Sequence, residues 1–239
     1  MALTGRGAVV LLAALLGAGV TARLGVWQLD RAAQKNTLQA ALDGRRTLPP
    51  LATAELATNE AQASTQHYRP IVAEGRWVAD HSVYLENRQM NGRPGFYVVT
   101  PLLLADGSAV AVQRGWLPRD AADRTKIAAP VTPDGPVRVA GHIAPPPGRL
   151  YDFGGAAGGA IRQNLDLAAF AVELHRPLRP LSIVQDDGPL TPQDGLLRQW
   201  PRPAADVQKH YGYAFQWFAM ATLILGLYVW FQLIRPRLR

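Results

Sequence analysis

The sequence predicts an α+β membrane protein, in which two terminal transmembrane helices flank an antiparallel β-rich extramembrane domain, curled or barrel-like, with helical cover. An apolar run lies near each end of the 239-residue chain. Strand patterns separated by turn signals fill the middle. All 18 acidic residues lie between Asp30 and Asp206, outside both apolar runs. We therefore expect a first span at 7–27, a domain at 28–209, a second span at 210–234 and a basic tail at 235–239.

The second span is the clearest segment of the chain. From Tyr211 to Ile234 no residue is charged, and such a run of about 24 residues forms a helix about 36 Å long, enough to cross a bilayer. At 100° per residue, one face of this helix carries a histidine, two small residues and two aromatic residues: His210, Ala214, Trp217, Ala221 and Tyr228. The two alanines leave room for a flat ligand or for a neighbouring helix.

The first span has an alternative interpretation. Ala8–Val20 is short for a span, and with Arg6 before it and small residues after it the run also fits a cleaved signal peptide. Apolar character resumes at Leu24–Trp27, however, so we favour a retained span. Leu29–Leu42 then shows a separate helical pattern, which we expect Asp43-Gly44 and Pro49-Pro50 to end.

Charge predicts the topology and excludes some partners. Arg235, Arg237 and Arg239 directly follow the second span, which favours a cytoplasmic C-terminus and places the middle segment outside. Much of the net charge of +7 comes from Arg6 near the N-terminus and from these three C-terminal arginines. The charge therefore suits a membrane flank rather than a nucleic-acid surface. The chain has no cysteine, which excludes disulfides, thiolate metal sites and a cysteine nucleophile.

The middle segment changes to a strand pattern after Tyr68. Ala105–Ser108 separates two apolar runs and predicts a hairpin, and Asn164 is placed to cap a helix over Leu165–Leu174. The predicted strands are Ile71–Trp77, Val83–Asn87, Phe96–Leu104, Ala109–Arg114, Val137–Ile143, Leu181–Gln185 and Leu196–Trp200.

Several short motifs occur in a specific order from the end of the first span to the start of the second. They are Leu24–Arg31, Tyr68–Pro70, Asn87–Arg88, Gly95–Leu102, Gln113–Pro118 and His210–Phe218. In this order and spacing the chain resembles the SURF1 family (Surfeit locus protein 1) over essentially its whole length. The family consists of membrane proteins that assist assembly of haem–copper cytochrome oxidases, and its bacterial members are thought to bind haem a.

The resemblance implies a function, a location and partners. It implies a haem chaperone of respiratory-chain biogenesis that helps insert haem a into subunit I of cytochrome c oxidase, with haem a synthase as a further partner. It places the chain in the lipid of the bacterial inner membrane as a multi-pass protein with a periplasmic domain. The alternative is a membrane-anchored scaffold that binds oxidase subunits without haem. An enzyme is not expected, because the sequence contains none of the common nucleophile, P-loop or zinc-protease motifs.

His210 is the main candidate site residue. Neutral imidazole is a common axial ligand of haem iron, and the resemblance favours this role over that of an interfacial histidine bonded to headgroups. Tyr213 and Trp217 would flank the macrocycle, or else belong to the aromatic belt of the membrane. Arg88 and Arg114 are candidates for contacts with haem propionates or partners, if their strands end at one rim. Without the resemblance, we favour a structural role for these arginines, in turns where the guanidinium bonds backbone carbonyls.

Four other histidines show no metal-ligand spacing, and we expect each to be a surface or satisfied residue. They are His67, His81, His142 and His175.

Overall fold

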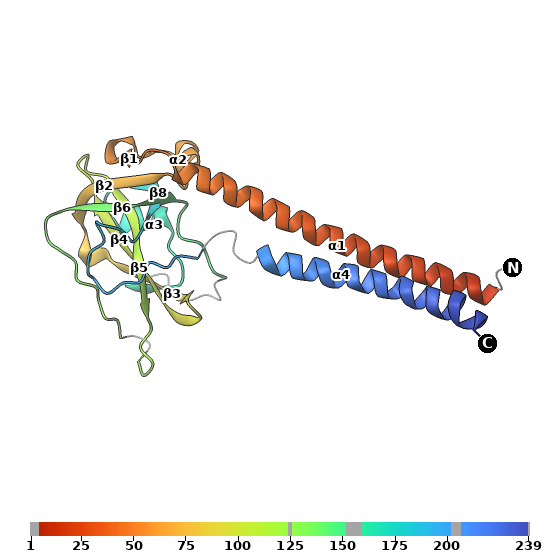
Figure 1. The fold of residues 1–239 in the computed structure, drawn as a ribbon. Coiled ribbons are helices and arrows are strands. Elements are labelled where there is room, and N and C mark those ends of the chain that lie inside the picture. Colours follow the sequence, from red (N-terminus) through yellow and green to blue (C-terminus); the bar gives the residue numbers. More distant parts are fainter. Residues whose placement is uncertain (1–4, 124–125, 152–158, 202–206, 239) are drawn as a thin grey trace. The chain divides into compact units, whose positions relative to one another are not determined.

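The computed structural model describes residues 5–123, 126–151, 159–201 and 207–238. The chain divides into two compact units. One is helical and comprises Met1–Ala41 and Arg202–Arg239, and the other is the β domain, Leu42–Pro201. Figure 1 shows the elements of both.

The helical unit contains two long helices. Helix α1 runs over Gly5–Arg46, and α4 runs over Val207–Tyr228 and continues as a π-helical segment, Val229–Ile234, and a 3-10 turn, Arg235–Arg237. Their most apolar 18-residue windows have mean hydropathies of 2.0 and 1.8. Both helices are therefore long and apolar enough to span a bilayer, as the sequence predicts.

Helix α1 differs from the prediction in its length. It continues past Trp27 and through the predicted Leu29–Leu42 helix to Arg46, so it ends after Asp43-Gly44 and before Pro49-Pro50. No proline lies within it, and strong helix formers follow Trp27, so nothing breaks the backbone hydrogen bonds.

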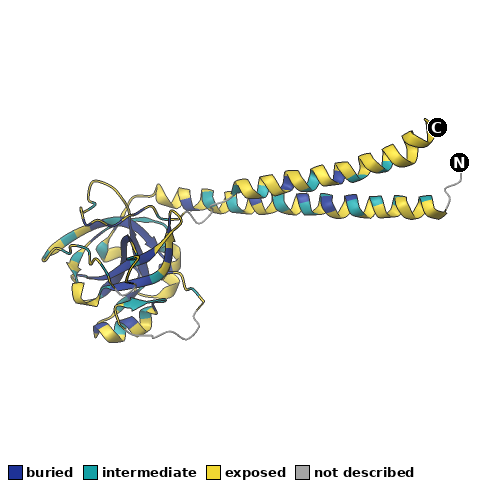
Figure 2. Cartoon of the chain, turned by 90° about the horizontal axis from the view of Figure 1, so that it is seen from below, coloured by how far each residue is buried: buried dark blue, intermediate teal, exposed yellow. Residues whose placement is uncertain are grey.

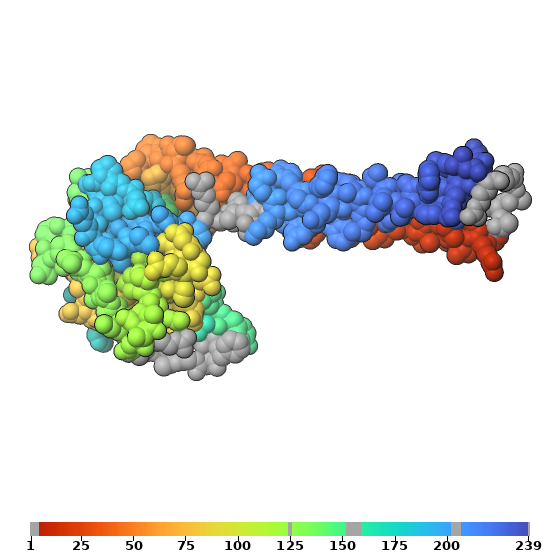
Figure 3. Space-filling view, turned by 60° about the horizontal axis from the view of Figure 1, so that its bottom comes forward, coloured from red at the N-terminus to blue at the C-terminus, as the bar shows by residue number. Residues whose placement is uncertain are grey.

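The two helices pack antiparallel. Gly17 lies opposite Ile224, and Gly25 lies opposite Phe218, so residue numbers rise on one helix as they fall on the other. Figure 2 shows the buried residues as a stripe along each helix, and in Figure 3 α4 (blue) covers much of α1 (red).

The stripe has a heptad pattern. Its residues recur alternately three and four positions apart, as in a coiled-coil seam. On α1 they are Leu11, Ala14, Ala18, Thr21, Gly25, Gln28 and Ala32, and on α4 they are His210, Ala214, Trp217, Ala221, Ile224 and Tyr228. We call this the seam. The helical face predicted for the second span is therefore the face that packs on α1.

Small residues bring the helices close together. A Cβ added at Gly25 would lie 2.8 Å from Cζ of Phe218, so the phenyl ring rests directly on the glycine backbone. Ala214 is only 2% exposed and Ala221 8%. Such small-residue contacts are typical of helix pairs in membranes.

The β domain is built on one mixed sheet of eight strands. Two helices, α2 (Glu60–Gln66) and α3 (Leu167–Leu174), and the 3-10 turns Thr53–Glu55 and Ala79–His81 accompany it. The strands are β1 (Leu51–Ala52), β2 (Pro70–Trp77), β3 (Val83–Met90), β4 (Arg93–Leu103), β5 (Ala109–Pro118), β6 (Pro136–Ala144), β7 (Ile161–Arg162) and β8 (Leu178–Gln185).

The sheet curls into a ring. Its order is β1-β2-β6-β8-β5-β4-β3-β7, and an additional pairing of β2 with β4 joins Arg76 to Leu103 and Trp77 to Leu102. Strands β2, β6, β8, β5 and β4 thereby close a five-stranded ring, which confirms the curled, barrel-like prediction. The sheet is not wholly antiparallel, because β5 pairs with β8, β1 with β2, and β3 with β7 in parallel.

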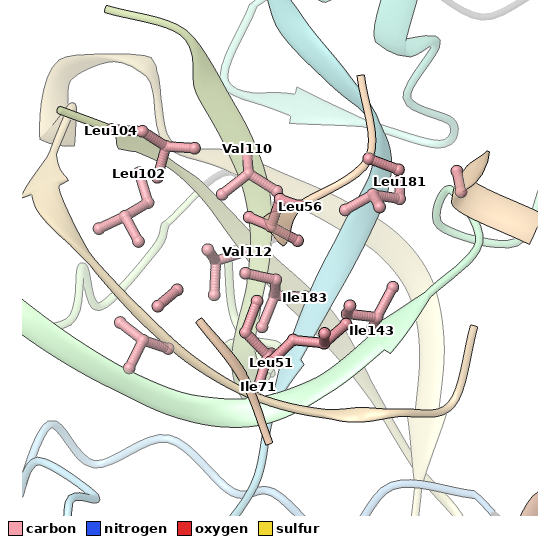
Figure 4. Packing of buried hydrophobic residues seen from close by; sticks show 14 residues of the cluster. Leu51, Leu56, Ile71, Leu102, Leu104, Val110, Val112, Ile143, Leu181 and Ile183 are labelled. Carbon is pink, nitrogen blue, oxygen red and sulfur yellow. The ribbon is translucent and has the colours of Figure 1, made fainter. Parts of the chain in front are cut away.

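The ring encloses an aliphatic core. Inward-facing side chains from alternate strand positions meet inside it, and β1 and the segment before α2 cover one end. Figure 4 shows this cluster, which includes Leu51, Leu56, Ile71, Leu102, Leu104, Val110, Val112, Ile143, Leu181 and Ile183. A second cluster packs α3 against β3 and β4 through Phe170, Leu85 and Val99.

Two local predictions are wrong. Leu196–Trp200 forms no strand, although Leu197 makes a single bridge to Trp116. Helix α3 is capped by Asp166, whose carboxylate accepts from the backbone N–H groups of Ala168 and Ala169. Asn164 instead bonds the backbone of Leu150. The remaining predicted strands and the Ala105–Ser108 hairpin are confirmed.

Candidate functional site

His210 lies in the first turn of α4, half-buried in the seam. Its Nδ1 is 2.7 Å from Oε1 of Gln28 on α1. An amide oxygen only accepts hydrogen bonds, so Nδ1 donates in this contact in the tautomer that carries the proton on Nδ1. The other ring nitrogen, Nε2, then keeps its lone pair, which is the form of imidazole that binds iron.

A second polar bridge joins the helices beside the first. Nδ2 of Asn36 donates to the hydroxyl of Tyr211 over 3.2 Å. The two bonds connect consecutive residues of α4 to α1, so two polar contacts join the helices near the start of α4.

The two alanines of the predicted face do not leave an open slot. Ala214 and Ala221 are covered by α1, so the neighbouring-helix alternative applies to them. Trp217 is half-buried in the seam, two turns from His210, whereas Tyr213 is 52% exposed. A flat ligand on His210 would therefore contact the exposed surface near Tyr213 rather than the alanine stripe.

A bare metal ion does not fit this site. Within the described ranges, no three His, Asp or Glu side chains are grouped as metal ligands. A lone imidazole suits an iron whose other ligands come with it, and the four pyrrole nitrogens of haem meet that requirement. The donor set around His210 therefore fits haem.

The other histidines have separate structural settings. Nδ1 of His142 lies 3.0 Å from both oxygens of Asp186, so it is a satisfied residue as predicted. His175 adopts the left-handed conformation that ends α3, and His81 is exposed in a 3-10 turn. His67 differs from the prediction, because its Nε2 is buried without a hydrogen-bond partner among the described residues. Burial, followed by the charge of Arg45, lowers the pKa of His67.

Arg88 and Arg114 lie within strands rather than at a shared rim. Their strands, β3 and β5, are separated by β4. The indole N–H of Trp116 crosses this gap to the backbone oxygen of Arg88 over 3.0 Å, above Gly95. A Cβ at Gly95 would lie 2.4 Å from that indole. Residues of three sequence motifs, Asn87–Arg88, Gly95–Leu102 and Gln113–Pro118, thus contact one another across β3, β4 and β5.

Arg114 is part of a buried charge cluster. The residue is 1% exposed, and its guanidinium donates to Asp194 at 3.3 Å, to Thr132 at 2.6 Å and to the oxygen of Val131 at 3.0 Å. Arg198 donates to the same carboxylate at 2.7 Å. Burial lowers the pKa of Arg114, and the charge of Asp194 opposes that change.

Arg88 is 8% exposed and donates to the backbone oxygen of Gln163 at 3.0 Å. Burial lowers its pKa. Each arginine bonds a backbone carbonyl, as in the structural alternative, but from within a strand and not a turn, and Arg114 also bonds Asp194 and Thr132. A propionate contact remains a prediction.

The sequence did not predict three residues that contact the candidate site residues in the structure, directly or through a shared carboxylate. Gln28 was part of a motif but received no role, although its spacing from Thr21 and Gly25 places it on the seam. Arg198 lies in the predicted strand Leu196–Trp200 and Asp194 lies just before it, and no local pattern connects either residue to Arg114.

Known proteins resemble this chain over most of its length. A profile of the SURF1 family matches residues 15–222. A SURF1-like protein of Rickettsia felis is 26% identical over 211 residues, covering 86% of this chain and 89% of its own. A SURF1-like protein of Rickettsia bellii is also 26% identical, covering 86% and 83%. The cytochrome oxidase assembly protein SHY1 of Saccharomyces cerevisiae is 28% identical over 95 residues, covering 39% and 24%. The profile covers the β domain and most of α1 and α4 on either side of it, and this chain therefore belongs to the SURF1 family.

Proposed function

We propose that this protein assists assembly of cytochrome c oxidase by binding haem a at His210 and passing it to subunit I. Family membership and the yeast relative named for oxidase assembly support the assembly role. Support for the haem step comes from one observation, the 2.7 Å contact between Nδ1 of His210 and Oε1 of Gln28. In the tautomer with the proton on Nδ1, that contact leaves Nε2 unprotonated and so available to iron.

The site also suits release. A single imidazole at the start of a helix, half-exposed, offers iron one protein bond and little enclosure. A transfer protein requires affinity that its acceptor can exceed, and one axial bond without a closed pocket gives that. Haem supplies the iron, and the protein supplies the axial ligand and the apolar surface beside it.

The same proposal places the protein in the bacterial inner membrane. The Arg residues after α4 favour a cytoplasmic C-terminus, with the β domain in the periplasm and His210 at the periplasmic edge. Alkaline phosphatase inserted at Gly188, in an exposed loop of the domain, is expected to be active, and the same reporter at the C-terminus inactive. The opposite pattern would reverse the topology.

The proposal includes a first span that is retained as a membrane helix and not cleaved as a signal peptide. Helix α1 is continuous through Val20–Ala22, and Thr21 is buried in the seam. Removal of the preceding residues would leave half of the α4 face uncovered. The intact mass of membrane-extracted protein is expected to include residues before Ala22.

Haem content tests the function. Protein purified from cells that make haem a is expected to show a Soret band, and His210→Ala to lose it, because alanine offers no lone pair to iron. His175→Ala, a change at an exposed helix end, is the matched control and should keep the band. Added imidazole should restore part of the binding to His210→Ala.

Parent protein that carries no haem although it supports oxidase assembly would favour the scaffold alternative. His210→Ala protein that carries as much haem as the parent would instead show that the haem ligand is another residue.

A further inference from the structure

We propose that Gln28 is the positioning residue of the site: its side-chain oxygen holds the proton of His210 on Nδ1 and thereby directs Nε2 to the ligand. This inference rests on the proposed function for its consequence, but the proton position can be measured without haem. The contact itself joins two residues that are 182 positions apart in the chain.

The geometry favours a genuine hydrogen bond. The two atoms are 2.7 Å apart, at the short end of the range for a nitrogen donor and an oxygen acceptor. Among the described contacts, His210 has this one hydrogen-bond partner, and it engages one ring nitrogen alone. The two tautomers of a neutral histidine are otherwise close in energy, so a single acceptor suffices to select between them.

The seam holds Gln28 in place. One turn before it lies Gly25, under the ring of Phe218, and one turn after it lies Ala32, which is fully buried. Small neighbours on both sides let α4 approach until a glutamine, rather than a longer side chain, spans the gap to the imidazole. The bridge between Asn36 and Tyr211 is a separate polar contact between the same two helices and does not involve the imidazole.

The chemistry of the acceptor also matters. Hydrogen bonding from Nδ1 raises the basicity of Nε2, and it does so more strongly to a carboxylate than to a neutral amide. A glutamine therefore orients the ligand while strengthening it moderately, which suits a protein that must release its haem. A glutamate at the same place should bind iron more strongly and lower the haem reduction potential.

The first experiment measures the tautomer in haem-free protein. Full-length protein labelled with ¹⁵N-histidine is studied in detergent at alkaline pH, and the His210 signal is assigned by its loss in His210→Ala. The parent should show a protonated Nδ1 and an unprotonated Nε2. Gln28→Met keeps the length of the side chain without an acceptor oxygen, and it should give a mixture of tautomers. Gln28→Glu should retain the parent tautomer.

Asn36→Ala is the matched control. It removes the other polar bridge between the same helices at the same end, without touching the imidazole. It should leave the His210 tautomer unchanged, whereas a purely structural role of Gln28 predicts that both changes act alike.

The second experiment measures haem affinity and reduction potential. Gln28→Met should weaken haem binding about 10- to 100-fold, the usual effect of losing a hydrogen bond behind a metal ligand. Gln28→Glu should retain haem with a more negative potential than the parent, and Asn36→Ala should resemble the parent in both quantities.

The outcomes separate this inference from the proposed function. If the parent binds no haem but the tautomer responds to Gln28→Met as expected, the function fails and the positioning stands. If Gln28→Met keeps both the tautomer and the parent haem affinity and potential, the positioning role is wrong while haem binding stands. A parent protein with the proton on Nε2 would also overturn the inference.

Discussion

The two units of this protein are packed with different kinds of side chain. The β domain fills its interior with large aliphatic side chains, a fully buried tryptophan and a cluster in which one carboxylate bonds two buried arginines. The seam between α1 and α4 uses glycine and alanine along most of its length, and polar pairs near one end.

The difference follows from the solvent around each unit. In water, burial of large apolar groups drives folding, so the domain encloses as much of them as it can. Lipid is as apolar as leucine, so large side chains gain little by leaving it, and close backbone contact and hydrogen bonds hold the helices together instead. The polar pair of Gln28 and His210 therefore stands out from an otherwise apolar seam.

The largest expected effect lies in the domain. Asp194→Ala leaves two buried arginines without their shared carboxylate, and breaking such a pair typically costs about 3–5 kcal/mol of unfolding free energy. Denaturation of the detergent-solubilised full chain, followed by limited proteolysis of the domain, measures the loss.

The control is Asp187→Ala. Its carboxylate is 64% exposed and lies 4.0 Å from Arg198, so its removal should cost about 0–1 kcal/mol. Equal losses for the two variants would contradict a special role for the buried cluster.

A smaller effect is expected from placing a larger side chain in the seam. Gly25→Leu places a side chain where the ring of Phe218 lies, and such overpacking typically costs about 1–3 kcal/mol. Because the chain has no cysteine, spin labels can be attached at cysteines introduced at the exposed residues Val26 and Phe215. The distance between the labels should increase in Gly25→Leu.

Gly19→Leu is the matched change on the open face of α1, where no atom lies within 4 Å of an added Cβ. It should leave the label distance unchanged. A distance that responds equally to both substitutions would mean that the helices do not pack through this seam.

The smallest expected effect is electrostatic and lies in the hairpin between β4 and β5. Hydrogen bonds from Ser108, and then Arg179, lower the pKa of Asp106. A lowered pKa in the folded state stabilises the fold above the unfolded value, near 4, and the contribution is lost as the pH falls through the folded value. The carboxylate is half-exposed, so Asp106→Asn should cost no more than about 1 kcal/mol at pH 7. The difference from the parent should vanish in acid, and a difference independent of pH would show that the carboxylate charge is not responsible.

Periodicity explains what could be predicted from the sequence. The 3.6-residue repeat identified the face of α4 that is buried, and alternation with turn signals located most strands. The length of α1 was underestimated because a change from apolar to polar residues at Trp27 marks a change of surroundings and not the end of a helix.

Long-range partners could not be predicted in this way. Arg114 and Asp194 are 80 positions apart, and Gln28 and His210 are 182 apart. Only the closure of the sheet and the pairing of the helices bring them together. The ligand candidate was therefore visible in the sequence, while the residue that orients it was not.

The most direct test of the central claim is to detect the bond between His210 and iron. Pulsed electron paramagnetic resonance of the ferric haem protein, labelled with ¹⁵N-histidine, reports nitrogen nuclei coupled to the iron. The account predicts a histidine nitrogen coupled to iron in the parent and in His175→Ala, and none in His210→Ala, even after haem is added back. A histidine coupling that persists in His210→Ala would show that the iron is held elsewhere.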